Sequence, residues 1–154
     1  GEDDMKLQWV RVLLALLTAI TLPATAADTA GVIKRVQGTV TLQRAGQGLP
    51  VAAGTPVQVG DRLVTGADGS VGLTMADDSL LTAGPASTLV ISQFRFDSTT
   101  NDGNMLVELL KGTLHFVSGL IAKQAQQNVK VQTRNAMMGV RGTEFIVDAR
   151  GDAP

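Results

Sequence analysis

Few residues of this chain are of types that carry out catalysis or hold a metal. His115 is the only histidine and cysteine is absent, so a zinc site would need carboxylates to complete it and thiolate chemistry is excluded. No serine stands in the G-x-S-x-G sequence of the hydrolase nucleophile elbow. Asp77 and Asp78 are adjacent, and in extended backbone their side chains would point to opposite faces. We therefore predict a protein that is not an enzyme and that needs no cofactor or metal.

One loop has the spacing of a calcium site. Asp97, Thr99 and Asn101 occupy positions one, three and five of an EF-hand count, and Glu108 occupies position twelve. Position six, which requires glycine, is Asp102, and no helical sequence flanks the loop. A hairpin whose turn includes Asp102 is the favoured interpretation.

Composition argues against several classes of partner. Basic residues number 13 and acidic residues 14, and the two kinds become equal in number when residues 1–26 are left out. A neutral domain lacks the positive surface that nucleic acids and anionic membranes attract. Trp9 is the single tryptophan and there is no tyrosine, which disfavours stacking platforms for bases or sugars. We predict a protein or cell-envelope component as the partner, and no nucleic acid.

The N-terminal segment has the features of a secretory signal peptide. Lys6 and Arg11 precede or border a short apolar run, and Ala24 and Ala26 then form an Ala-x-Ala site. The apolar run is about half the roughly 20 residues that a membrane-spanning helix needs. We predict cleavage before Ala27 and a periplasmic or secreted product without a membrane span. An uncleaved signal anchor is the alternative.

From residue 31 onward, apolar and polar residues alternate in short runs separated by glycine. Runs of period two at about ten-residue spacing predict an all-β domain. We expect strands at 32–36, 39–44, 57–59, 62–65, 71–75, 80–83, 88–96, 105–111, 113–117, 129–134 and 143–147. Residues 46–50 are expected to form a loop, and 118–127 a short helical turn with Ser118 as its cap. The expected architecture is a twisted β-sandwich, a roll or a short solenoid-like wrap of about ten short strands with antiparallel pairings.

Two groups of residues at fixed spacing stand out within this pattern. The first comprises a Gly-Asp corner, a Thr-Gly turn and an acidic-Ser turn, made by Gly60, Asp61, Thr65, Gly66, Asp78 and Ser79. The second is the sequence GVRGTEF, with Gly139, Arg141, Gly142, Thr143, Glu144 and Phe145. Its two glycines predict a backbone that turns or bulges where no Cβ can be accommodated.

Together the two groups resemble the pattern of FecR-type periplasmic domains. Residues 54–87 are similar to the family's run of corner, turns and a Gly-Pro-x-Ser stop, and GVRGTEF is similar to its closing motif. The resemblance covers residues 31–149 and implies an all-β domain. Most family members have glycine where Asp78 stands, and aspartate tolerates the left-handed backbone of such a turn. The family pattern normally continues past the last strand, so the resemblance implies either a missing final strand or a truncated chain, and either would leave a sheet edge unpaired.

The resemblance also completes the predicted domain organisation. We expect a signal peptide at 1–26 with residues 1–4 extraneous to it, a linker at 27–30, a FecR-like β-domain at 31–150 and a flexible tail at 151–154. FecR-type proteins are typically regulators that carry a signal from an outer-membrane transporter to a cytoplasmic sigma factor. They do so through a cytoplasmic segment, a membrane span and this kind of domain. The few residues ahead of the apolar run are too short for a sigma-binding helix bundle, so we do not expect that direct role.

We therefore expect an exported, non-catalytic module that binds a protein or an envelope component, with a role in envelope signalling. A partner strand could add to an exposed sheet edge. The alternative is a structural, self-assembling β-domain, and an enzyme is the least favoured interpretation. Within GVRGTEF, either Arg141 and Glu144 pair with neighbours at a strand corner, or Arg141 is a fixed donor for a partner or a buried carboxylate.

Overall fold

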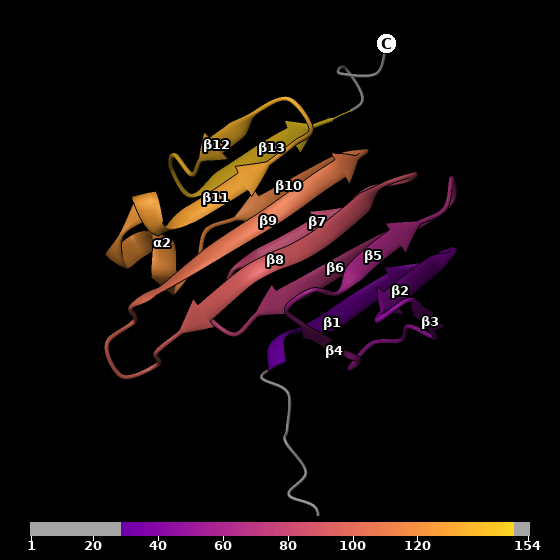
Figure 1. The fold of residues 1–154 in the computed structure, drawn as a ribbon, viewed down its shortest axis with the longest axis horizontal. Coiled ribbons are helices and arrows are strands. Elements are labelled where there is room, and N and C mark those ends of the chain that lie inside the picture. The colour runs from indigo at the N-terminus through magenta and orange to yellow at the C-terminus, as the bar shows by residue number, and fades with distance from the viewer. Residues whose placement is uncertain (1–28, 150–154) are drawn as a thin grey trace, which may run out of the picture.

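A computed structural model describes residues 29–149, which form two facing β-sheets with a short helical segment at one end (Figure 1). The strands are β1 (Thr29–Gln37), β2 (Val40–Arg44), β3 (Gln47–Leu49), β4 (Pro56–Gln58), β5 (Arg62–Thr65), β6 (Ser70–Met75), β7 (Leu80–Ala83), β8 (Thr88–Phe96), β9 (Gly103–Lys111), β10 (Thr113–Val117), β11 (Val129–Gln132), β12 (Met137–Gly139) and β13 (Glu144–Asp148). The helices are α2 (Leu120–Gln124) and the 3-10 helix η1 (Gln126–Asn128). The predicted signal peptide, its cleavage residues Ala24, Ala26 and Ala27, and the predicted tail lie outside the described residues.

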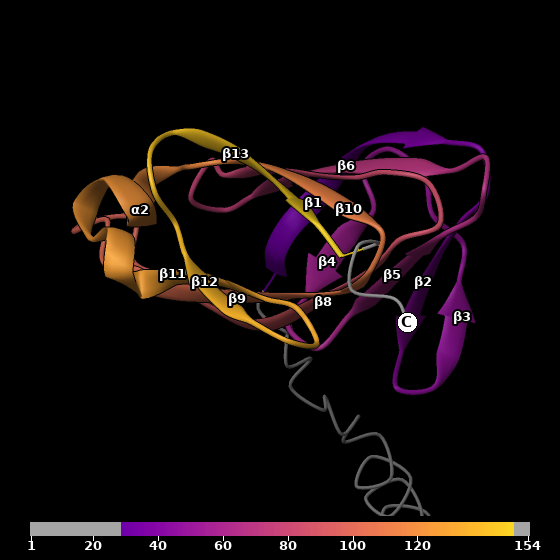
Figure 2. The same cartoon turned by 90° about the horizontal axis from the view of Figure 1, so that it is seen from above.

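The chain wraps around one core by passing repeatedly between the two sheets. Sheet A has six strands in the order β13-β10-β7-β6-β1-β4, and sheet B has seven in the order β12-β11-β9-β8-β5-β2-β3. Figure 2 shows the two layers face to face, with the helical segment at one end. The prediction of an all-β fold is confirmed, and the structure is a sandwich with the wrapped connectivity of a roll.

Alternating burial along the strands explains why they pack in this way. In β6, Val71, Leu73 and Met75 are buried, whereas the residues between them are half-buried. In β9 of the opposite sheet, Val107 and Leu109 are fully buried. Fully burying one such side chain contributes about 1.5–3 kcal/mol. The inward faces of the two sheets therefore supply the main driving force for folding.

Two short strands are present that the sequence pattern does not predict. β3 lies in the expected loop at 46–50, and β12 lies between the two strands expected near the C-terminus. Both strands have three residues, lie at a sheet edge and are mostly exposed. They carry no buried alternation, so only pairing with β2 and β11 identifies them as strands. The described residues therefore contain thirteen strands rather than about ten, and β1 begins at Thr29, within the expected linker.

One strand pair departs from the expected antiparallel arrangement. β11 runs parallel to β9, with Val129 opposite Met105 and Val131 opposite Val107. A parallel pair needs a crossover connection. Here β10 carries the chain back through sheet A, and α2 and η1 then lead it across to sheet B. The helical turn predicted at 118–127 is therefore the connection that permits this pairing.

The N-terminus of α2 is held by Asp77, which precedes Asp78 and Ser79 of the acidic-Ser turn. The amide of Leu120 donates to the carbonyl oxygen of Asp77 (2.7 Å), and the amide of Ile121 donates to its carboxylate Oδ2 (3.3 Å). Ser118, the predicted cap, instead donates its hydroxyl to the carbonyl of Gly142 (3.2 Å). The prediction for Ser118 is wrong because the cap comes from a turn more than 40 residues away in sequence.

The loop considered as a calcium site forms the turn of the β8–β9 hairpin. The amide of Asp97 donates to the carbonyl of Asp102 (2.8 Å), and the Asp102 carboxylate accepts from the amide of Gly103 (3.0 Å). Glu108 lies within β9 and accepts a hydrogen bond from the Ser92 hydroxyl (2.8 Å). The hairpin interpretation is confirmed.

Candidate functional site

The Gly-Asp corner is an internal contact of the fold. Asp61 is 1% exposed and accepts hydrogen bonds at both carboxylate oxygens from Arg44, at 2.9 Å from Nε and 2.7 Å from Nη2. It also accepts from the amide of Gln58 (2.8 Å). Gly60, which precedes it, has φ +91°, where glycine is favoured. Asp61 therefore joins β2 to the β4–β5 corner.

The Thr-Gly turn is tied to the Gly-Pro-x-Ser stop. The Thr65 hydroxyl donates to the carbonyl of Gly84 (2.7 Å) and accepts from the amide of Ser87 (2.8 Å). Gly66 donates its amide to the carbonyl of Thr39 (2.9 Å). Two segments that the sequence shows only as separate turns therefore meet in one hydrogen-bonded corner.

The acidic-Ser turn has two aspartates with different roles. Asp78 is exposed and has φ +68°, the left-handed conformation expected from the sequence. Asp77 is fully buried, and its carboxylate accepts from the amide and the hydroxyl of Ser79 (3.1 and 2.9 Å) as well as from α2. Asp61, Thr65, Asp77 and Ser79 are all buried, so they offer little surface to a partner.

The GVRGTEF segment carries the chain from sheet B to sheet A at the C-terminal end of the sandwich (Figure 2). Val140 is 3% exposed, whereas Arg141 is exposed and Gly142 has φ +78°. Phe145 stacks on Phe116 with ring centroids 5.1 Å apart. The motif thus anchors its apolar residues in the core and leaves its arginine at the surface.

The expectations for Gly139 and for Arg141 are wrong, whereas the turn expected at Gly142 is confirmed by its φ of +78°. A Cβ at Gly139 would meet no atom within 4 Å, so steric exclusion does not explain that glycine. Gly142 also has open space, and its positive φ is what favours glycine there. Arg141 is exposed, so the alternative in which it bonds a buried carboxylate is also wrong. Glu144 does pair with a neighbour, because its Oε1 contacts Nε2 of His115 across β10 and β13.

β13 leaves one side of sheet A open among the described residues. The carbonyl of Thr143 and the amide of Ala149 both bond the β10 segment at 2.8 Å. Bonded and non-bonded residues alternate along an antiparallel pair. Phe145 and Val147 lie two and four residues after Thr143, so their N–H and C=O groups also face β10. Glu144 and Ile146 alternate with them and therefore direct their N–H and C=O groups to the open side.

An apolar patch adjoins this open edge on the outer face of sheet A. Ile146 is 73% exposed and Leu80 of β7 is 44% exposed. Val117 of β10 lies directly opposite Leu80 and is half-buried. Val117 is also a diagonal neighbour of Ile146, because it lies opposite Glu144, whereas His115, which pairs with Glu144, lies directly opposite Ile146. The patch made by Leu80, Val117 and Ile146 therefore reaches the edge of the sheet.

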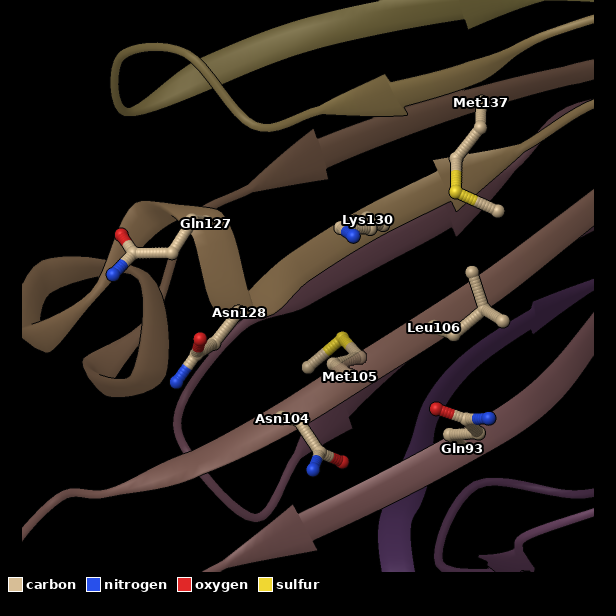
Figure 3. A pocket seen from close by; sticks show the side chains of 8 residues that line it. All are labelled: Gln93, Asn104, Met105, Leu106, Gln127, Asn128, Lys130 and Met137. Atoms are coloured by element: carbon tan, nitrogen blue, oxygen red, sulfur yellow. The ribbon is translucent and has the colours of Figure 1, made fainter.

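A groove occupies the outer face of sheet B near η1. It has a volume of about 380 Å³ and is lined by Gln93, Asn104, Met105, Leu106, Gln127, Asn128, Lys130 and Met137 (Figure 3). The Asn128 amide is oriented by donating from Nδ2 to the carbonyl of Gly103 (2.9 Å). The sequence does not predict this groove, because the residues that line it come from four strands and η1 and follow no linear motif.

Within residues 29–149, no group of three or more histidine, aspartate and glutamate side chains could hold a metal ion. None of the helices in that range is long and apolar enough to span a membrane.

Comparison with known families identifies the chain. A family model described as FecR protein matches residues 61–154, which is more than half of the sequence. The chain belongs to the FecR family. This confirms the resemblance, and both Asp61 and the GVRGTEF segment lie within the matched residues. No curated protein and no solved structure matches the chain.

The FecR match begins later than the folded domain. β1 lies inside sheet A between β6 and β4, and β2 lies inside sheet B between β5 and β3. Ile33 of β1 and Leu42 of β2 are fully buried. Residues 29–60 are therefore part of the same core as the matched FecR region.

Proposed function

We propose that this FecR-family domain is an exported, non-catalytic module that binds another protein by adding one of its extended segments to the open edge of β13. Ile146 carries the proposal, because it is 73% exposed and its backbone groups are directed away from β10. Exposed apolar edge strands are templates for strand addition. Membership of a family of regulators supports a protein partner.

The neighbouring surface favours a partner that is apolar at the position next to Ile146. A strand added beside β13 would place alternate side chains on the outer face of sheet A. There they would extend the patch made by Leu80, Val117 and Ile146. Side chains on the other face would cover Phe145, which is only half-buried. Both faces of the added strand can therefore gain apolar contacts.

The charge beside Ile146 favours a different protein over a second copy of this chain. A closed dimer has two-fold symmetry, so two β13 strands would pair in antiparallel fashion. Registers that overlap most of the strand place Glu144 opposite Glu144, Ile146 or Asp148 of the second copy. None of these residues offers the positive charge that stabilises a cross-strand pair with glutamate. A partner with lysine or arginine at that position would add an attractive cross-strand pair to the contact that Glu144 already makes with His115.

A peptide selection tests the proposal and does not require the natural partner to be identified first. Random nine-residue peptides displayed on phage would be selected on the purified protein, and amide hydrogen exchange would locate the bound peptide. We expect slower exchange at the amides of Glu144 and Ile146. Ile146→Pro removes the outward-facing N–H without removing a bond to β10, and it should weaken binding about tenfold.

The matched control is Ile146→Thr, which keeps the backbone N–H and a strand-forming side chain. It should bind more tightly than Ile146→Pro, and both variants should melt within a few degrees of the parent. Protection that maps elsewhere, or equal binding by the proline variant, contradicts the proposal. A molecular mass that doubles as the protein concentration rises, and that returns to the monomer value in Ile146→Pro, would favour the self-assembling alternative instead.

Export is a separate part of the proposal and rests on the predicted signal peptide. The residues that support it are Lys6, Arg11 and the Ala24-x-Ala26 site. The test is the N-terminal residue and the cell fraction of the protein isolated from its host. A soluble envelope species that begins near Ala27 is expected. A membrane-bound species that retains Met5 would contradict cleavage and favour the signal anchor.

A further inference from the structure

We propose that the groove on sheet B is a second binding site, which takes an oligosaccharide of acetamido sugars. Its volume of about 380 Å³ lies in the range of ligand pockets. It is formed by β8, β9, β11, β12 and η1. β13, the strand of the proposed protein-binding edge, belongs to the other sheet. The inference is therefore independent of the proposed function.

The position of the groove on a sheet face limits how it can recognise a ligand. β9 is bonded to β8 on one side and to β11 on the other, and β11 is bonded to β12. The backbone groups of these central strands are used within the sheet. β12, which contributes Met137, is the edge strand of sheet B. Over the rest of the groove a ligand must be recognised by side chains, which favours a sugar over an extended peptide that needs a free strand edge.

The lining side chains are complementary to an acetamido group. Gln93, Asn104, Gln127 and Asn128 carry primary amides, each of which both donates and accepts hydrogen bonds. Figure 3 shows them distributed around the groove, with Leu106 and Met137 to one side of Lys130. An acetamido sugar offers an N–H donor, a carbonyl acceptor and a methyl group, and its hydroxyls both donate and accept.

Apolar contacts and charge agree with this class of ligand. Leu106 and Met137 provide apolar surface for a methyl group or the C–H face of a sugar ring, in place of the aromatic platform that the composition lacks. Lys130 is the charged residue of the lining, and no carboxylate is part of it. The groove therefore accepts a neutral sugar or one with a single acidic group near Lys130.

Titration of the ¹⁵N-labelled protein with chitotetraose, an oligomer of N-acetylglucosamine, tests this inference. We expect saturable chemical-shift changes in the amides of β8, β9 and η1. Cellotetraose, which has the same length but no acetamido groups, should bind at least about threefold more weakly, because it loses at least one hydrogen bond per site. Gln93→Ala and Asn104→Ala should each weaken chitotetraose binding about three- to tenfold.

Gln43→Ala is the matched control, because Gln43 is an exposed amide of sheet B that does not line the groove. It should leave chitotetraose binding unchanged, as should Ile146→Pro, which tests only the β13 edge. Absence of saturable shifts, equal binding of cellotetraose, or equal loss in Gln43→Ala would overturn the inference. Shifts at the same residues with a neutral peptide but not with the sugar would also overturn it, and would assign the groove to peptide recognition.

Discussion

The guanidinium of Arg44 bonds both carboxylate oxygens of Asp61 across 17 residues of sequence, at 2.9 and 2.7 Å. Asp61 is almost completely buried, whereas the Arg44 side chain is 32% exposed. Paired hydrogen bonds between arginine and carboxylate are strong and fix geometry. This pair therefore links β2 to the corner that precedes β5.

Arg44→Met should lower the free energy of unfolding by about 2 kcal/mol, because it removes hydrogen bonds from a buried carboxylate. Urea denaturation of the variant and the parent measures the difference. Arg62→Met is the control, because Arg62 is exposed, and it should change the free energy by less than about 0.5 kcal/mol. Equal effects of the two substitutions would contradict the structural role of the pair.

The effect of Arg44→Met should be the same at pH 7 and pH 9. The hydrogen bond that Arg44 donates to Asp61 raises the pKa of the Arg44 guanidinium, burial lowers it, and charge attraction to Asp61 raises it further. A group with a raised folded pKa contributes stability that is fully present below its unfolded pKa and is lost as pH rises through the folded value. Both values lie far above pH 9. If the loss of unfolding free energy in Arg44→Met, relative to Arg62→Met, were smaller at pH 9 than at pH 7, this assignment would be contradicted.

Asp77→Ala and Asp78→Gly should have opposite effects although the residues are adjacent. Asp77→Ala should cost about 3 kcal/mol, because it leaves the amides of Ser79 and Ile121 without their buried acceptor. Asp78→Gly should be neutral or stabilising by up to about 1 kcal/mol, because φ +68° is strained for a residue with a Cβ. Thermal melts of both variants check this, and a large loss in Asp78→Gly would contradict it.

The two glycines of the closing motif should respond differently to alanine. Gly142→Ala should cost about 1 kcal/mol, because its φ of +78° is unfavourable for alanine. Gly139→Ala should change stability by less than about 0.5 kcal/mol, because a Cβ there meets no atom within 4 Å and its φ is not positive. Chemical denaturation distinguishes the two outcomes. Equal costs would show that the motif constrains both positions by another contact.

Arg141→Ala should leave the free energy of unfolding within about 0.5 kcal/mol of the parent, because Arg141 is exposed. Its neighbour Val140 is 3% exposed, and Val140→Ala should cost about 2 kcal/mol. Peptides selected on the β13 edge supply the second measurement. Weaker peptide binding by Arg141→Ala at unchanged stability would assign Arg141 to the partner, whereas a loss of stability near 3 kcal/mol would contradict its surface position.

The sequence by itself determined the fold class, most strand positions and the family. Alternating burial has a period that is visible in the sequence, so β5, β7, β8 and β10 have the predicted bounds. Turn residues can also be recognised from the local sequence, and Asp78 adopts the left-handed backbone expected of it. These features depend on a residue and its near neighbours, so they can be predicted without the tertiary structure.

Only the tertiary structure decided which residues meet. Folding brings together residues from distant segments: Asp77 with Ile121, Arg44 with Asp61, and the amide side chains of the groove with one another. Nothing in the local sequence of these residues specifies a partner. Edge strands such as β12 have no buried face and therefore no periodic signal. The open side of β13 follows from the strand order in sheet A, which is set by packing of the whole core and is not encoded at Ile146 itself.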